Sequence, residues 1–154
     1  MNIRRAKAED AEAISALINT FADHFTLDPD GIGAERFLDS ITPLGIESIV
    51  TALNFYYLIA EIDGHLAGAI ALRDGRHLFH LFVAPEYQRS GMARTLWLAV
   101  KQGASDGIEA FTVNSSINAV PVYERFGFRA TGLRTEMNGI AFVPMKADVT
   151  ASSL

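Results

Sequence analysis

A short segment of the chain has the residue types of a phosphate-binding turn. It consists of Gln88, Arg89, Ser90, Gly91, Met92 and Ala93, with Arg94 next. An apolar run precedes the segment and apolar residues at helical spacing follow it, so we expect a strand-to-helix turn. The first N–H groups of a helix lack intrahelical acceptors and lie at its positive end, which favours a bound anion. Gly91 and Ala93 leave room for a diphosphate, and Arg89 and Arg94 can add charged contacts.

A second segment, residues 112–128, reads as a strand, a loop and a short helix that contains Tyr123. Pro121 fits the first turn of this helix if Asn118 caps it, because the missing N–H would have no partner there. Gly127 is expected to end the helix in a left-handed conformation. Asn114 and Asn118 are typical of a strand-end turn and a helix cap, but they could also line a cleft.

Together these two segments resemble the diagnostic blocks of the GNAT N-acetyltransferase superfamily. Residues 88–93 match the pattern Gln/Arg-x-x-Gly-x-Gly/Ala, and residues 123–128 match Tyr-x-x-x-Gly-Phe. A glycine after a strand is equally typical of an ordinary tight turn. The agreement of the two blocks therefore carries the resemblance, and the glycine alone would not. Other phosphate loops fit poorly, since neither Gly-x-x-x-x-Gly-Lys-Ser/Thr nor a strand-linked Gly-x-Gly-x-x-Gly with a following acid occurs.

The resemblance implies a site for acetyl-CoA, used as a co-substrate without a metal. The pantetheine arm would pair with the edge of the strand at Leu81, Phe82 and Val83, and a backbone N–H near Phe82 or Val83 would polarise the thioester carbonyl. Asn114 and Asn118 would contact the pantetheine or line the cleft. Tyr123 would lie near the thioester sulfur and give a proton to the departing thiolate, since a phenol is protonated at neutral pH.

Four residues are candidates for the base that takes the proton from the amine: His77, His80, Glu61 and Glu136. His77, at the start of the strand, is the preferred candidate. Alternation along a strand predicts that His80, three residues on, lies on the opposite sheet face. Glu61 and Glu136 are weaker candidates, and bulk water can also take the proton.

The function expected from the resemblance is transfer of an acetyl group from acetyl-CoA to a primary amine, by direct attack in a ternary complex. The acceptor would be a small-molecule or peptide amine. The first alternative is a non-catalytic acyl-CoA-binding regulatory module, against which Tyr123 argues. The second is protein modification, which a shallow open groove would favour.

The composition supports one domain in a reducing compartment. The 154 residues are 49% hydrophobic and contain no cysteine, which excludes disulfides and thiolate metal sites. A net charge of −5 argues against nucleic-acid binding and mildly favours a cationic acceptor. No apolar run is long enough to span a membrane, so we expect a cytoplasmic protein. Exposed edges of the C-terminal strands favour a homodimer.

The fold expected from the resemblance is α+β: a mixed, mostly antiparallel central sheet of about seven strands flanked by about four helices. Residues 1–147 would form the domain and residues 148–154 a frayed tail. Asp63-Gly64 is a strong hairpin signal between two β-rich runs, and a third strand follows at residues 77–83. The segment 28–53 is expected to form one or two short helices that cover the substrate.

Overall fold

A computed structural model describes residues 1–149. Its central sheet has eight strands in the order β1-β2-β3-β4-β5-β8-β6, with β7 paired to β8. The strands are β1 (Asn2–Arg5), β2 (Phe55–Ile62), β3 (His65–Arg73), β4 (His77–Val83), β5 (Ala110–Ser115), β6 (Arg129–Ala130), β7 (Thr135–Met137) and β8 (Ile140–Asp148). The helices are α1 (Ala11–Asn19), α2 (Glu35–Ser40), α3 (Pro43–Val50), α4 (Met92–Val100) and α5 (Val120–Arg125).

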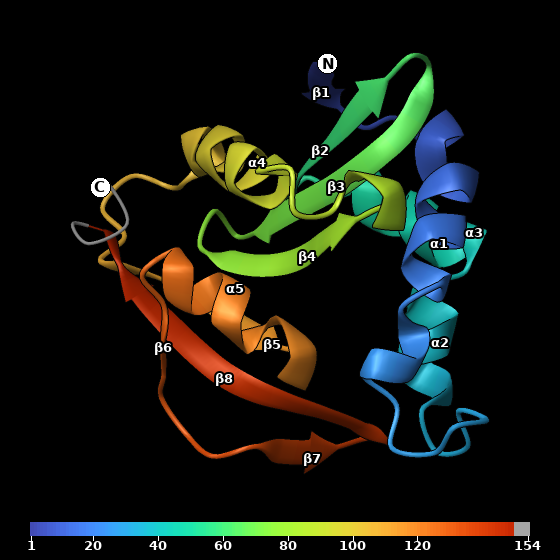
Figure 1. The fold of residues 1–154 in the computed structure, drawn as a ribbon, viewed down its shortest axis with the longest axis vertical. Helices are drawn as coiled ribbons and strands as arrows, with labels where there is room; N and C mark the ends of the chain where they lie inside the picture. Colours follow the sequence, from blue (N-terminus) through green and yellow to red (C-terminus); the bar gives the residue numbers. More distant parts are fainter. Residues whose placement is uncertain (150–154) are drawn as a thin grey trace.

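Every described pairing within the sheet is antiparallel except the pairing of β4 with β5. The mixed, mostly antiparallel α+β architecture predicted from the sequence is therefore confirmed. In Figure 1, β2, β3 and β4 occupy the upper half of the molecule, and β8 with β7 the lower half. The sheet thus consists of two parts that meet at the β4–β5 pair.

The two faces of the sheet are covered by different helices. Along β2, Leu58 and Ala60 pack in a core with α4 and α5, whereas Tyr57 and Ile59 pack in a second core with α1 and α3. This alternation arises because successive side chains of a strand point to opposite faces. Figure 1 shows α1, α2 and α3 together on one side of the molecule.

Two turns follow the sequence signals closely. Asp63 and Gly64 both have positive φ, at 51° and 78°, as the hairpin between β2 and β3 requires. Gly127 has a φ of 97° directly after α5, which confirms the left-handed end predicted for this helix.

The start of α5 differs from the sequence prediction. A short 3₁₀ helix, Ile117–Ala119, precedes α5, so the residue before the α-helix is Ala119 and no side chain caps it. Asn118 is therefore not the cap, and its side chain is free for another use. Pro121 does lie in the first turn of α5, as predicted.

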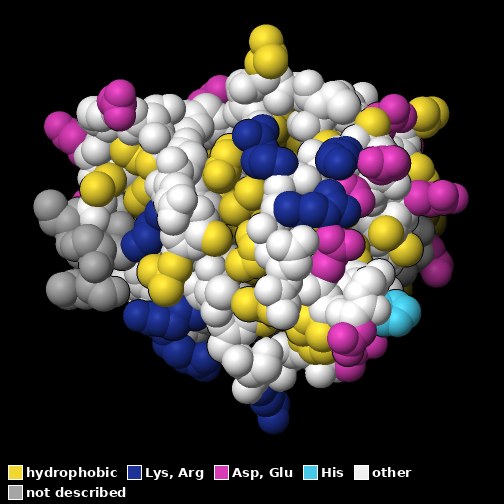
Figure 2. Space-filling model, turned by 90° about the horizontal axis from the view of Figure 1, so that it is seen from above, with side chains coloured by type: hydrophobic (Ala, Val, Ile, Leu, Met, Phe, Trp, Pro, Cys, Tyr) yellow, Lys and Arg dark blue, Asp and Glu magenta, His cyan; other side chains and the backbone are white. Residues whose placement is uncertain are grey.

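β8 continues to Asp148, one residue beyond the domain end expected from the sequence. The rest of the predicted tail, residues 150–154, lies outside the described residues. None of the helices within residues 1–149 is both long and apolar enough to cross a membrane. On the face drawn in Figure 2, basic and acidic side chains lie side by side near the centre, with hydrophobic side chains scattered among them.

Candidate active site

A cleft opens where β4 and β5 separate. The two strands pair only through His77 with Thr112 and Leu78 with Val113. Beyond Leu78, the edge of β4 that faces β5 has no strand partner among the described residues. A cavity of ≈ 790 Å³ occupies this region, lined by residues of β4, the turn before α4, β5, α5 and the segment between α1 and α3.

The exposed edge of β4 presents particular backbone groups to the cavity. The N–H of Ala84 donates to the carbonyl of Ala67 at 2.9 Å, so residues 82 and 84 direct their backbone groups toward β3. Because backbone direction alternates, Leu81 and Val83 direct theirs into the cleft. All of Leu81, Phe82 and Val83 line the cavity. Of the two N–H groups considered for the thioester carbonyl, the register therefore favours Val83 over Phe82.

The turn before α4 presents a row of unpaired N–H groups. For the backbone N–H groups of residues 89–94, residues 1–149 provide no hydrogen-bond acceptor. Arg89 and Gly91 have positive φ, at 62° and 84°, and this bends the chain into the helix. A Cβ at Gly91 would meet nothing within 4 Å, so the space in front of the turn is open. This is the arrangement expected of an anion-binding turn.

The side chains of this turn divide into two groups. Gln88, Arg89, Met92, Ala93 and Arg94 line the cavity together with Gly91. The Gln88 side chain also donates to the carbonyl of Val83 at 3.0 Å and so ties the turn to the end of β4. Ser90 is not among the lining residues, and its hydroxyl donates to the carbonyl of Tyr87. The hydroxyl hydrogen of Ser90 is therefore engaged, and its backbone N–H is the donor that remains for a ligand.

Tyr123 lies on α5 and lines the cavity with little exposure of its side chain. Residues 1–149 offer its hydroxyl no hydrogen-bond partner, yet they contain no fully buried side-chain N or O atom that lacks one. The hydroxyl oxygen therefore keeps some exposure, and Tyr123 lines the cavity. Burial raises the pKa of Tyr123 above its ordinary value, so the phenol stays protonated.

Asn114 and Asn118 also line the cavity. Asn114 is on β5, opposite Pro144 of β8 in the register, and Asn118 is in the 3₁₀ helix before α5. The structure thus brings Tyr123 and both asparagines to the same cavity.

The two histidines of β4 do not lie as alternation predicted. His77 is paired with Arg73, and His80 is paired with Ala71. Because Arg73 and Ala71 are two residues apart on β3, their partners lie on the same face of the sheet. The register shifts between Ala71 and Leu72, which leaves Phe79 as an extra residue in β4. The expectation that His77 and His80 lie on opposite faces was therefore wrong, and both line the cavity.

Each histidine has one ring nitrogen bound to a neighbouring hydroxyl. Nδ1 of His77 lies 2.8 Å from Oγ1 of Thr112, and Nδ1 of His80 lies 2.8 Å from the hydroxyl of Tyr57. Burial, with help from the nearby Arg73, lowers the pKa of His77 to about 4, and burial lowers the pKa of His80 to about 3. Both rings are therefore neutral at neutral pH and can accept a proton.

The two glutamates considered as bases are placed elsewhere. Neither Glu61 nor Glu136 lines the cavity. Glu61 accepts a hydrogen bond from Nε of Arg4 at 2.7 Å, and Glu136 pairs with Arg134 at the surface.

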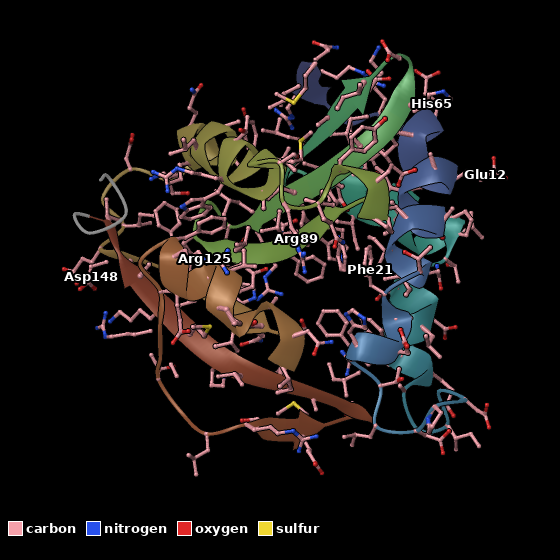
Figure 3. All side chains as sticks on the ribbon, in the orientation of Figure 1. Glu12, Phe21, His65, Arg89, Arg125 and Asp148 are labelled. Carbon is pink, nitrogen blue, oxygen red and sulfur yellow. The ribbon has the colours of Figure 1, made fainter. Side chains whose placement is uncertain are left out.

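The opposite end of the cavity is formed by residues that the sequence did not single out. Phe21, Phe25, Phe37 and Ser40 reach it from the α1–α3 segment. Arg73 of β3 and Arg125 of α5 also line the cavity. In Figure 3, Arg89 and Arg125 lie in the region between β4 and α5, and Phe21 lies toward α1. No local pattern marks these residues, because distant segments bring them together.

Comparisons with known proteins agree with this geometry. Residues 24–149 match the family model of the acetyltransferase (GNAT) domain. The chain is 30% identical over 141 residues to the uncharacterized N-acetyltransferase YhfO of Bacillus subtilis (strain 168), covering 83% of this chain and 89% of that protein. Together with the fold and the cleft, the match over most of the chain shows that this protein belongs to the GNAT acetyltransferase family.

Solved structures show the same fold at low sequence identity. A GCN5-related N-acetyltransferase from Rhodopseudomonas palustris superposes with a TM-score of 0.77 at 22% identity, covering 96% of this chain and 95% of that chain. The PaiA N-acetyltransferase of Thermoplasma acidophilum, solved in complex with coenzyme A, superposes with a TM-score of 0.72 at 20% identity, covering 96% and 98%.

Proposed function

We propose that this protein transfers an acetyl group from acetyl-CoA to a primary amine, by direct attack within a ternary complex. One observation carries the proposal: residues 89 and 91–94, whose backbone N–H groups are unpaired, the open edge of β4 and Tyr123 all border the same cavity. An anion site, a peptide-like edge and a proton donor are the three features that a CoA thioester needs. The GNAT family match supports this assignment.

The turn binds the pyrophosphate of the cofactor. Its N–H groups satisfy the phosphate oxygens, and Arg89 and Arg94 add charge-assisted contacts at the rim. The backbone of Leu81 and Val83 pairs with the amides of the pantetheine arm, as an added strand would. Asn114 and Asn118 contact the arm from the opposite wall.

The acetyl transfer needs two proton movements. The neutral amine nitrogen attacks the thioester carbonyl carbon, and the Val83 N–H stabilises the negative charge that develops on the oxygen. The tetrahedral intermediate collapses, the C–S bond breaks, and the sulfur takes a proton or a strong hydrogen bond from the Tyr123 hydroxyl. The apolar surroundings that raise the pKa of Tyr123 also disfavour a bare thiolate and so raise the pKa of the CoA thiol. The pKa values of the proton donor and the acceptor therefore shift in the same direction.

The other proton leaves the attacking nitrogen. His77 accepts it at Nε2, in the tautomer whose Nδ1–H donates to Oγ1 of Thr112. A histidine whose pKa is lowered to about 4 is a weak base, so the nitrogen becomes acidic enough only once it has begun to bond to the carbonyl carbon.

The proposal is tested by incubating the protein with acetyl-CoA and a panel of primary amines while the released CoA thiol is measured. Amine-dependent thiol release, with an amine heavier by one acetyl group in mass spectrometry, is the expected result. Acetyl-CoA binding with no transfer to any amine would favour the regulatory module instead.

A further inference from the structure

The acceptor end of the cavity is a cluster of aromatic rings. Phe82 of β4 lies 5.9 Å from Phe21 and 6.3 Å from Phe25, measured between ring centroids. Phe25 in turn lies 5.4 Å from Phe37 of α2. All four line the cavity, as does Phe142 of β8. We call Phe21, Phe25, Phe37, Phe82 and Phe142 the aromatic wall. Such a wall favours an apolar body of aromatic size.

The charges around the cavity have one sign. The described residues that line it include Arg73, Arg89, Arg94 and Arg125, and no Asp or Glu. This contrasts with the net charge of −5 of the whole chain. A second ammonium group on the acceptor would lose water in the cavity without gaining a carboxylate partner from its lining. The lining therefore selects against polycationic acceptors.

The aromatic wall is closed by a contact between two loops. The N–H of Leu27 donates to the carbonyl of Gly139 at 2.9 Å, and the N–H of Ala141 donates to the carbonyl of Phe25 at 2.8 Å. A Cβ at Gly139 would lie 2.4 Å from the backbone of Gly33, so the segment after α1 and the β7–β8 hairpin pack backbone to backbone. This contact fixes the position of the Phe25 backbone and hence the width of the acceptor end.

From these observations we infer that the acceptor is a primary amine on an aromatic or other apolar body, with no second positive charge. The inference rests on the proposed function for its acyl chemistry, but the binding preference follows from the lining alone. It narrows the sequence-based expectation of a cationic acceptor to an amine with a single positive charge, because the charge of the whole chain does not describe the cavity.

Binding of amines to the protein saturated with CoA tests this inference without requiring turnover. Hexylamine and hexamethylenediamine differ only in the second amine, and phenethylamine adds a ring. Titration calorimetry should show hexylamine and phenethylamine binding at least about tenfold more tightly than the diamine. Equal or tighter binding of the diamine, or binding of none of the three, would overturn the inference. Binding of phenethylamine without any acetyl transfer would instead refute the proposed function alone.

A matched pair of variants sharpens the test. Ser40 lines the cavity, and its hydroxyl donates to the carbonyl of Phe37. Ser40→Asp places a carboxylate in the cavity, while Ser40→Asn adds similar volume without charge. The preference for hexylamine over the diamine should shrink several-fold in Ser40→Asp and persist in Ser40→Asn. The same preference in both variants would contradict the electrostatic part of the argument.

Discussion

The two ends of the cavity are built from different parts of the polypeptide. At the cofactor end, the backbone of residues 89–94 and the edge of β4 face the ligand. At the acceptor end, phenylalanine side chains from α2, β4, β8 and the segment after α1 do so. Backbone groups bind the same chemical groups whatever side chains surround them. A substitution at the acceptor end can therefore alter the choice of amine while the cofactor end keeps its ligand.

The largest expected effect is on chemistry at the boundary between the two ends. Tyr123→Phe removes the only group of α5 to which we assign a proton, so kcat should fall by about 10²–10⁴-fold. The affinity for CoA should change by less than about twofold, because the ring still fills its place among Phe126 and Phe128. Steady-state kinetics and CoA titration measure both quantities. Tyr56→Phe, on a tyrosine outside the cavity lining, is the control.

Unchanged turnover in Tyr123→Phe would remove Tyr123 from the mechanism. An equal loss in Tyr56→Phe would point to a general effect of removing a phenol.

The next largest effect is expected on amine binding, with acetyl-CoA binding unchanged. Gly139→Val forces the β7–β8 hairpin away from Gly33, since its Cβ would lie 2.4 Å from that backbone and its φ of 77° disfavours a β-branched residue. KM for the amine should rise by about tenfold or more. The affinity for acetyl-CoA should stay within about twofold of wild type.

The control for that change is Gly64→Val, because Gly64 has a φ of 78° and open space around its Cβ. Loss of acetyl-CoA affinity in Gly139→Val would show that the two ends are not independent.

A third prediction concerns His77, one of the two neutral histidines of β4. The folded-state pKa of His77 is depressed from 6.5 to about 4, so the folded state resists a proton that the unfolded chain accepts. Stability is therefore fully present above pH 6.5 and is lost as the pH falls toward 4. The loss should reach up to about 1.4 kcal/mol per pH unit for such a group.

Urea unfolding between pH 7 and pH 4.5 measures this loss, and His77→Gln should show a shallower dependence on pH. An identical slope in the variant and the wild type would mean that His77 is not held neutral by the fold.

The smallest effect is expected at the cationic rim. Arg125→Ala should weaken acetyl-CoA binding by about two- to fivefold at low salt, because Arg125 is exposed and screened. The difference should diminish at high salt, and phenethylamine binding should not change. Arg36→Ala, on an exposed arginine outside the lining, is the control. If Arg125→Ala weakened acetyl-CoA binding equally at low and high salt, a contribution of the Arg125 charge would be contradicted.

The difference between the backbone-built cofactor end and the side-chain-built acceptor end also explains which features could be predicted from the sequence. The strand-to-helix turn at residues 88–93, the short helix that carries Tyr123 and the Asp63-Gly64 hairpin could be predicted because each is a local pattern that fixes backbone shape. The prediction that His77 and His80 lie on opposite faces of the sheet was wrong, because the extra residue at Phe79 depends on the register of β4 with β3. The cap assigned to Asn118 failed for a local reason, since a 3₁₀ helix precedes α5.

Little of the aromatic wall could be predicted from the sequence, although Phe37 lies in the segment 28–53 that was expected to cover the substrate. Phe21, Phe82 and Phe142 are separated by about sixty residues each and are brought together only by the complete sheet. Apolar residues at such positions are typical of any core, so nothing in the local pattern distinguishes them. Acceptor identity therefore needed the assembled cavity.

The most direct test of the account is calorimetric titration of acetyl-CoA into wild type, Gly91→Glu and Gly64→Glu. Both glycines have positive φ and open space at the Cβ position, but only Gly91 borders the cavity. Gly91→Glu places bulk and negative charge in front of the N–H groups and should weaken binding at least about a hundredfold, whereas Gly64→Glu should bind as wild type does. Equal binding by all three proteins would contradict a cofactor site at residues 88–93.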